Sequence, residues 1–130
     1  MDFRQTYCFD DLLLVPKYSD IKSRSEVDLS SDLSTDIGLN LPVISSPMDT
    51  VTESSMAIAM QAFGGLGIIH RYNTIDEQAA LVRDARKKGA DHVGAAIGVT
   101  GDHEERACML YDAGARIICL DIAHGHHAMM

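Results

Sequence analysis

The fold is decided by a stretch that runs from Gly64 to Gly98 and reads GGLGIIHRYNTIDEQAALVRDARKKGADHVGAAIG. Its two short apolar runs, Leu66 to His70 and Val93 to Ile97, have the length of buried strands. Between them an amphipathic segment begins at Thr74, a residue type that caps helices, and ends before Gly89, a residue type that closes them. Strand, loop, helix, glycine and strand in this order are typical of a βα unit on a parallel sheet.

The same alternation continues on both sides of this stretch. Further buried strands are predicted at Val43 to Ser46 and at Ile117 to Asp121, which spaces the strands by about 24 residues, as βα repeats require. Thr74 and Glu77, three residues apart, form the pattern of a capping box. The predicted helices begin at Thr52 or Ser54, at Thr74 and at about Asp102, and they end at Gly64, Gly89 and Gly114.

Residues 1–42 do not follow this alternation, because an apolar segment from Phe9 to Val15 is followed by a stretch rich in Ser and Asp. We therefore expect a single partial domain over residues 1–130, with residues 1–42 as an N-terminal arm and residues 43–130 as three βα units and a fourth strand. The fold class is α/β, as the N-terminal half of a (β/α)8 TIM barrel or as part of an open sheet. A complete barrel needs about 200 residues or more, so a half-barrel would leave two sheet edges unpaired and would need a partner.

The composition is that of a globular domain with an acidic balance. Of the 130 residues, 46% are hydrophobic, and 19 acidic against 11 basic side chains give a formal net charge of -8. This balance argues against a nucleic-acid partner, because binding to the phosphate backbone requires clustered Lys and Arg. No apolar stretch has the roughly 20 residues of a membrane span, and no signal peptide begins the chain, so we expect no membrane association and a cytoplasmic location. Three cysteines, an odd number, agree with a reducing compartment.

Polar residues follow each predicted strand, at the edge of the sheet where ligands bind in both candidate architectures. After the first strand, the hydroxyl of Ser46 and the thioether of Met48 suit a ribose or a flat purine, although spacing alone favours a capped strand end with Met48 packed. After the fourth strand, Asp121 suits the hydroxyls of an NAD ribose. The same carboxylate with His124 and His126 suits a divalent metal ion, and a plain polar loop is the third interpretation.

Two other features have structural explanations. The glycines at positions 64, 65 and 67 precede a strand instead of following one, so they are expected to end a helix and not to form a phosphate loop. Cys108 falls within a helix pattern and Cys119 within a predicted strand, which predicts that both are core residues. Cys8 lies in the arm, without a positioned histidine. No residue is identified as catalytic.

Six motifs in chain order point to a known family. They are FDDLLLVP from Phe9 to Pro16, SEVDL from Ser25 to Leu29, SSPMDTVTE from Ser45 to Glu53, GGLGIIH from Gly64 to His70, VGAAIG from Val93 to Gly98, and DIAHGH from Asp121 to His126. Together they resemble the IMP dehydrogenase family over nearly the whole chain. The resemblance implies a (β/α)8 barrel, a homo-oligomer with four subunits, and NAD-dependent oxidation of inosine monophosphate (IMP) to xanthosine monophosphate (XMP) in purine and GMP biosynthesis.

The resemblance also implies roles for individual residues. Ser46 and Met48 match positions that contact the nucleotide substrate, and Asp121 matches the position that holds the NAD ribose. Ile122 and Ala123 match positions of the cofactor loop less specifically. These matches favour the nucleotide interpretation over the metal interpretation. The catalytic cysteine of the family, its potassium-binding loop, its phosphate loops and its mobile flap all lie farther along, so no catalytic residue is expected in this chain.

Two departures from the family's pattern carry expectations. Family members usually insert a pair of regulatory CBS modules after the second barrel helix, whereas residues 87–92 lead directly to the third strand here, so the barrel core is expected without that regulation. The absent cysteine predicts that the isolated 130-residue chain is inactive. One alternative is GMP reductase, which converts GMP to IMP with NADPH and typically has Ala-Asn-Met-Asp where this chain has Ser-Pro-Met-Asp. The other is a non-catalytic half-barrel that associates through its open edges.

Overall fold

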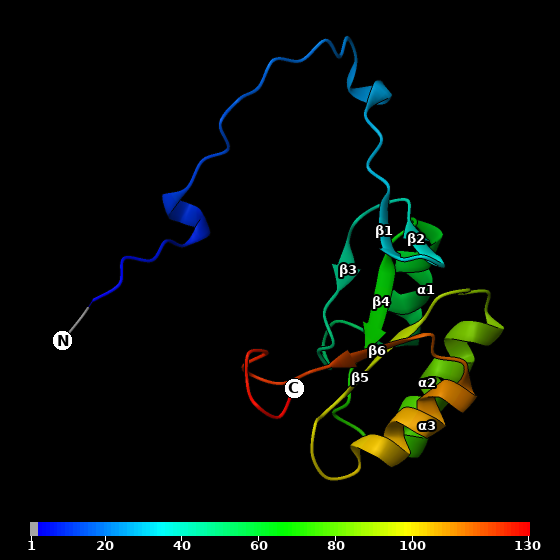
Figure 1. Ribbon diagram of the computed structural model, residues 1–130. Helices are drawn as coiled ribbons and strands as arrows, with labels where there is room; N and C mark the ends of the chain where they lie inside the picture. The colour runs from blue at the N-terminus through cyan, green and yellow to red at the C-terminus, as the bar shows by residue number, and fades with distance from the viewer. Residues whose placement is uncertain (1–2) are drawn as a thin grey trace.

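The computed structural model describes residues 3–130, in which a four-stranded parallel sheet carries three helices (Figure 1). The strands are β3 (Ile44–Ser45), β4 (Leu66–Ile69), β5 (Gly94–Ile97) and β6 (Ile117–Leu120), and they lie side by side in this order. The helices are α1 (Ser54–Ala62), α2 (Ile75–Lys87) and α3 (His103–Ala113), one in each connection between strands. The predicted α/β alternation is confirmed.

Helix α2 begins and ends where its local sequence predicts. The amide of Glu77 donates to the hydroxyl of Thr74 over 3.3 Å, and the Glu77 carboxylate accepts from the Thr74 amide over 2.9 Å, so the predicted capping box is present. The Glu77 carboxylate also accepts from the Thr74 hydroxyl over 2.8 Å, and the two hydrogen bonds it accepts, the one from the backbone amide first, hold the pKa of Glu77 below its usual value. The basic residues Arg86 and Lys87 occupy the last turn, where they complement the helix dipole.

The start of helix α1 differs from the prediction. Neither Thr52 nor Ser54 caps it, because the residue before the helix is Glu53 and its side chain makes no capping hydrogen bond. Thr52 is fully buried instead, and its hydroxyl donates to the carbonyl oxygen of Ser46 over 2.6 Å and to the Ser45 hydroxyl over 2.9 Å. The Thr52 hydroxyl, which was predicted to cap the helix, is therefore used in a tertiary contact with the turn after β3.

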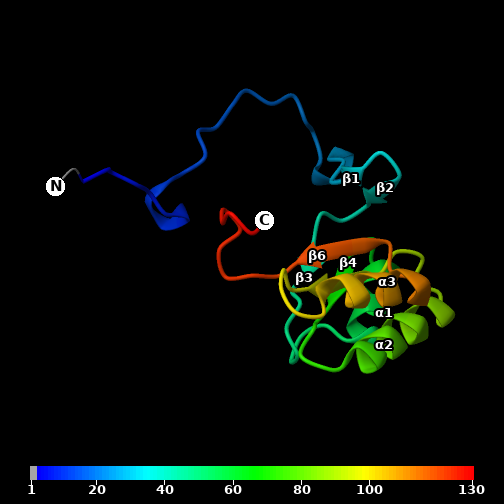
Figure 2. The same cartoon turned by 60° about the horizontal axis from the view of Figure 1, so that its bottom comes forward.

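All three helices cover one face of the sheet (Figure 2). The core on that face is rich in alanine and includes Ile69, Ala79, Val82, Val93 and Leu110. The opposite face forms a smaller cluster of Leu66, Ile68 and Ala96, with Leu39 packed on it. An open doubly wound sheet carries helices on both faces, whereas a barrel carries them only outside. The arrangement is therefore that of part of a (β/α)8 barrel.

The two outer strands are less buried than predicted. Every residue of β4 and β5 is buried, whereas β6 alternates between partly buried and exposed residues and β3 is only two residues long. The prediction of four fully buried strands was wrong for β3 and β6, because each of them has a neighbouring strand on one side only. Cys119, in β6, is partly buried.

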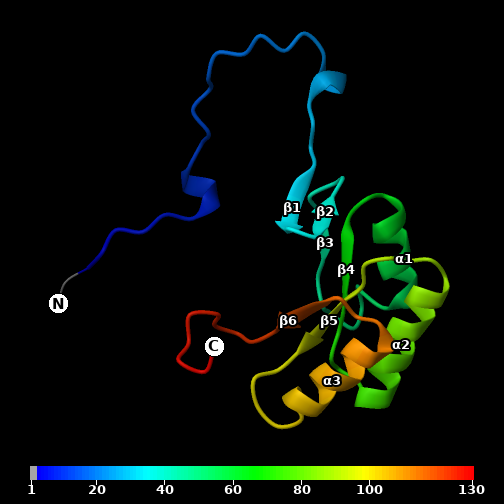
Figure 3. The same cartoon turned by 45° about the vertical axis from the view of Figure 1, so that its right-hand side comes forward.

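The N-terminal arm contains a short hairpin that the sequence pattern did not predict. Strand β1 (Ser31–Ser34) pairs antiparallel with β2 (Ile37–Leu39), and Leu39 of β2 joins the cluster on the helix-free face. Before the hairpin, residues 3–30 run away from the sheet and form two short 3-10 turns, Phe9–Asp11 and Arg24–Glu26 (Figure 3). Within residues 3–130, no helix has the length and apolar character needed to cross a membrane.

Candidate functional site

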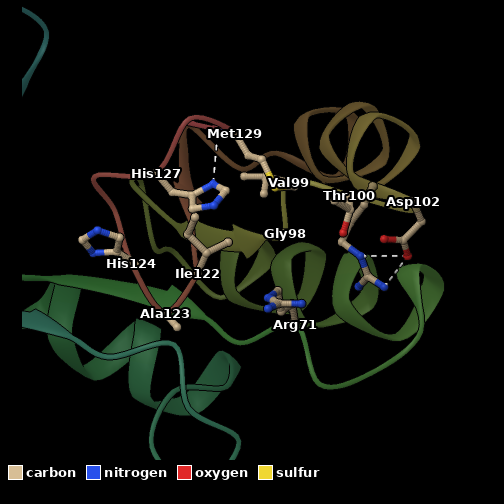
Figure 4. A pocket seen from close by; sticks show the side chains of 11 residues that line it. Arg71, Gly98, Val99, Thr100, Asp102, Ile122, Ala123, His124, His127 and Met129 are labelled. Carbon is tan, nitrogen blue, oxygen red and sulfur yellow. Dashed lines mark hydrogen bonds and ion pairs between the residues drawn. The ribbon is translucent and has the colours of Figure 1, made fainter.

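A cavity of about 350 Å³ lies at the carboxyl ends of β4, β5 and β6 (Figure 4). The loop after each of these strands contributes to its wall, as expected for the functional end of a parallel sheet. Its walls mix charged and apolar groups. They include Arg71 after β4, Gly98, Val99, Thr100 and Asp102 after β5, Arg106 from α3, and Ile122, Ala123 and His124 after β6.

An ion pair joins two of these loops. The Nε atom of Arg71 lies 3.3 Å from Oδ2 of Asp121, and its Nη2 donates to the carbonyl oxygen of the same residue over 3.0 Å. Both side chains are about one third exposed, and Arg71 lines the cavity. Within residues 3–130, Oδ1 of Asp121 has no hydrogen-bond partner in this arrangement.

A second network of hydrogen bonds, centred on the buried side chains of Arg106 and Gln78, lies next to the cavity wall. The Arg106 guanidinium donates to Oδ2 of Asp102 over 2.7 Å, to Oε1 of Gln78 over 2.8 Å and to the carbonyl oxygen of Asn73 over 3.2 Å. Gln78, fully buried, donates in turn to the carbonyl oxygens of Ile69 and Ala96, at the ends of β4 and β5. The hydrogen bond from Arg106 is the main cause of a lowered pKa of Asp102.

The structure brings some predicted site residues together and leaves others apart. Ile122 and Ala123 line the cavity, and Asp121 is held beside it through Arg71. Ser46 and Met48 follow the outer strand β3, where both are exposed and neither belongs to the cavity wall. The turn they form is fixed by Thr52, whose amide donates to the Met48 carbonyl and whose side chain holds the Ser46 carbonyl.

The metal interpretation of the fourth loop gains no support from the geometry. The rings of His124 and His126 are 6.4 Å apart between centroids, and they meet edge to face. Across residues 3–130, no three His, Cys, Asp or Glu side chains gather closely enough to hold a metal ion.

One of the two cysteines that were predicted to lie in the core is exposed. Cys108 is exposed on α3, so the prediction that it is a core residue was wrong. The helix buries Arg106 and Leu110, and a residue midway between them points to the opposite side of the helix. Burial, with a smaller contribution from the Asp121 carboxylate, raises the pKa of the Cys119 thiol.

Sequence reasoning missed the buried network. Arg106 and Gln78 were not identified as site residues. In the sequence, a single charged or polar residue in a helix is expected to face the solvent, and nothing local shows that these two side chains are buried. The spacing of Asp102 and Arg106, four residues apart at a helix start, was the available signal, since such pairs face each other. Arg71 was predicted as one of the polar residues after the second strand, and the GMP reductase alternative matched it to a position near the NADP phosphates, but its pairing with Asp121 was not predicted.

Comparison with known proteins finds a family match over nearly the whole chain. The sequence pattern described as "IMP dehydrogenase / GMP reductase domain" matches residues 6–130. Similar proteins include the inosine-5'-monophosphate dehydrogenase of Nitrosopumilus maritimus, which is 57% identical over 90 residues covering 69% of this chain and 19% of that protein. That of Cryptosporidium parvum is 36% identical over 91% of this chain and 39% of that protein.

The inosine-5'-monophosphate dehydrogenase of Bacillus subtilis is 48% identical over 74% of this chain and 20% of that protein. The chain therefore spans between about a fifth and two fifths of the length of these relatives. The parallel half-barrel, the polar loops at its carboxyl edge and these matches agree with one another. This chain belongs to the IMP dehydrogenase / GMP reductase family.

Proposed function

We propose that this chain forms the N-terminal half of an IMP dehydrogenase barrel, in which IMP is oxidised to XMP with NAD as the hydride acceptor. The observation that carries the proposal is the Asp121 carboxylate, one oxygen of which is held by Arg71, a residue of the wall of a cavity of about 350 Å³. A carboxylate oxygen at the end of a parallel strand is suited to accept hydrogen bonds from ribose hydroxyls. The family match over residues 6–130 supports the same reaction.

In this proposal the two groups of site residues bind different molecules. Ser46 and Met48 contact the IMP nucleotide from the turn after β3, where both side chains are exposed and ready to contact a ligand. Asp121, Ile122 and Ala123 bind the cofactor from the loop after β6. The apolar wall that Val99 and Ile122 give the cavity suits one ring system of NAD.

The charges around the cavity favour NAD over NADP. Both guanidinium groups of the wall are already paired, Arg71 with Asp121 and Arg106 with Asp102. A phosphate on the adenosine ribose needs a free cation, as an arginine beside the NADP ribose supplies in dinucleotide-binding folds. This supports an NAD-dependent dehydrogenase over the alternative, an NADPH-dependent GMP reductase.

We further propose that the 130-residue chain alone does not catalyse the reaction. Cys8 lies in the arm and Cys108 is exposed on α3, and the raised pKa of the Cys119 thiol keeps it neutral, which makes it a poor nucleophile. Potassium and the tetramer of the family belong to the complete barrel in this proposal. The free thiols agree with our proposal of a cytoplasmic location.

A chimeric barrel tests the proposed function. The aligned segment of the Cryptosporidium parvum enzyme, whose match covers 91% of this chain, is replaced by residues 6–130, and NADH formation from IMP and NAD is followed by absorbance. We expect turnover with this pair and none with GMP and NADPH. Asp121→Asn is expected to raise the KM for NAD about 10-fold or more, because a charged hydrogen-bond partner is lost.

The exposed acid Asp112 on α3 supplies the matched control. Asp112→Asn removes the same charge away from the cavity and should leave the KM for NAD unchanged. A chimera that prefers GMP and NADPH would refute the dehydrogenase assignment. Equal NAD kinetics for Asp121→Asn and the parent chimera would refute the cofactor role of Asp121.

A further inference from the structure

The turn after β3, which carries Ser46 and Met48, is held by one buried side chain. Thr52 is fully buried at the end of this turn, and its hydroxyl donates to the carbonyl oxygen of Ser46 over 2.6 Å. The amide of Met48 donates to the same oxygen over 2.9 Å, and the amide of Thr52 donates to the Met48 carbonyl oxygen over 3.0 Å. These three hydrogen bonds fix the backbone of both residues that are candidates for substrate contact.

Thr52 is fixed in turn by the residue that follows β4. The amide of His70 donates to the carbonyl oxygen of Thr52 over 3.3 Å, and Nε2 of the buried His70 ring lies 3.4 Å from Oε1 of Glu53. The other ring nitrogen, Nδ1, accepts from the amide of Tyr72 over 3.1 Å, so Nε2 is the nitrogen that donates to Glu53. The turn is therefore attached to the inner strand β4 as well as to β3, which is only two residues long.

Burial separates the residues that can touch a ligand from the residue that holds them. Met48 is 51% exposed and Ser46 is exposed, whereas Thr52 has no exposed surface. A ligand that binds a loose turn has to order it, and this ordering weakens binding. The Thr52 hydroxyl orders the turn before a ligand arrives. Because Thr52 itself cannot contact the ligand, any effect of this residue on binding has to act through the turn.

We propose that Thr52 is a positioning residue for the nucleotide substrate, whose hydroxyl holds the turn that presents Ser46 and Met48 to IMP. His70 supports it by holding the backbone of Thr52 and the side chain of Glu53 from the end of β4. The inference rests on the proposed function, because it takes IMP as the ligand of this turn.

Substrate and cofactor are positioned through different contacts in this proposal. In residues 3–130, no hydrogen bond joins the pair of Arg71 and Asp121 to Thr52. Loosening the turn after β3 should therefore weaken the binding of IMP and leave the binding of NAD unchanged. A general loss of stability would not separate the two ligands in this way.

Thr52→Val in the chimeric enzyme tests the proposal, because valine has nearly the shape of threonine and lacks the hydroxyl. We expect the Kd for IMP, measured by titration calorimetry without NAD, and the KM for IMP to rise about 5-fold or more, because a hydrogen bond that preorganises the turn is lost. The KM for NAD should not change. Thr52→Ser keeps the hydroxyl and should restore the Kd for IMP.

Thr74→Val is the matched control, because it removes a threonine hydroxyl elsewhere in the chain. That hydroxyl accepts from the amide of Glu77 over 3.3 Å at the start of α2. Its loss should lower the stability of the chimera and leave the Kd for IMP unchanged. Thr52→Val and Thr74→Val therefore separate positioning of the turn from destabilisation of the fold.

Amide hydrogen exchange in the 130-residue chain follows the turn directly, without nucleotide. Peptides that cover residues 46–52 should exchange faster in Thr52→Val than in the parent chain and Thr52→Ser. Peptides from β4 and β5 should stay protected, which also shows that the variant is folded. If Thr52→Val does not fold, His70→Asn is the second variant. Its amide oxygen can replace Nδ1 as acceptor for Tyr72, the contact with Glu53 is lost, and residues 46–52 should exchange faster and bind IMP more weakly.

The outcomes distinguish this proposal from the proposed function. An unchanged Kd for IMP in a folded and active Thr52→Val chimera would overturn the positioning role and leave the proposed function intact. Equal increases in the KM values for IMP and NAD, or unchanged exchange of residues 46–52, would also overturn it. A parent chimera that binds no IMP would instead refute the proposed function, and the role of Thr52 in IMP binding with it.

Discussion

Gly67 shows how closely one residue can fix the contact between a strand and a helix. A Cβ atom at this position of β4 would lie 2.5 Å from the Cα atom and 2.8 Å from the Cβ atom of Ala57 in α1. Gly67→Ala therefore forces the helix away from the sheet, and we expect the free energy of unfolding to fall by about 1–3 kcal/mol. Urea denaturation measures the change. Gly125→Ala, where no described atom lies within 4 Å of the new Cβ, should change it by less than about 0.5 kcal/mol.

Gln78 is the residue on which the network below the cavity depends. Its amide satisfies two strand-end carbonyl oxygens, and its own oxygen accepts from Arg106. Gln78→Met keeps the volume but leaves these buried partners without their hydrogen bonds, so we expect a loss of about 2–4 kcal/mol in the free energy of unfolding. Arg83→Met, at an exposed position of the same helix, is the control. Similar stability of the two variants would mean that the network contributes little.

At the scale of the element, helix α2 owes its start to the capping box. Thr74→Ala should lower the free energy of unfolding by about 1 kcal/mol. The box also depends on pH, because the pKa of Glu77 is lower in the folded chain than its ordinary value of 4.5. Its contribution is complete above that value and is lost as the pH falls through the folded-state pKa. Denaturation at several pH values should show the stability of Glu77→Ala approaching that of the parent in acid; a constant difference would contradict this.

The same elements show what local sequence can predict. The bounds of α2 depend on Thr74, Glu77 and Gly89, which are close in sequence to the structure they determine, and these were predicted correctly. The start of α1 was not, because Thr52 bonds to Ser46 across a turn that only the folded sheet creates. The hairpin β1–β2 was missed, because its first strand is exposed throughout and so lacks an apolar alternation.

For the whole molecule, the candidate site was predictable in position but not in detail. The rule that ligands bind at the carboxyl ends of parallel strands was enough to select the loop that begins at Asp121. The pairing of Arg71 with Asp121 joins residues 50 positions apart, and it depends on loops that meet over the intervening strand β5. Sequence spacing contains no information about such a pair until the order of the strands is known.

The N-terminal arm should be cleaved by proteases before the rest of the molecule. Leu13, Leu14 and Tyr18 are each at least 94% exposed, and the backbone around them is extended, so a protease can bind it without unfolding the sheet. We expect brief trypsin treatment to cut first after Lys17 and after the basic residues at 22 and 24, leaving a resistant fragment with the hairpin and the half-barrel.

The helices supply the internal comparison for this experiment. The guanidinium of Arg86 donates to the carbonyl oxygens of Ala90 and Asp91, and Arg106 is buried, so the bonds after these arginines become accessible only when the fold opens. Mass spectrometry of early digests should find them intact, and digestion in urea should cut them as fast as the arm. Early cleavage after Arg86 or Arg106 in the absence of urea would mean that the helices are no more stable than the arm, against the packing of α2 and α3 on the sheet.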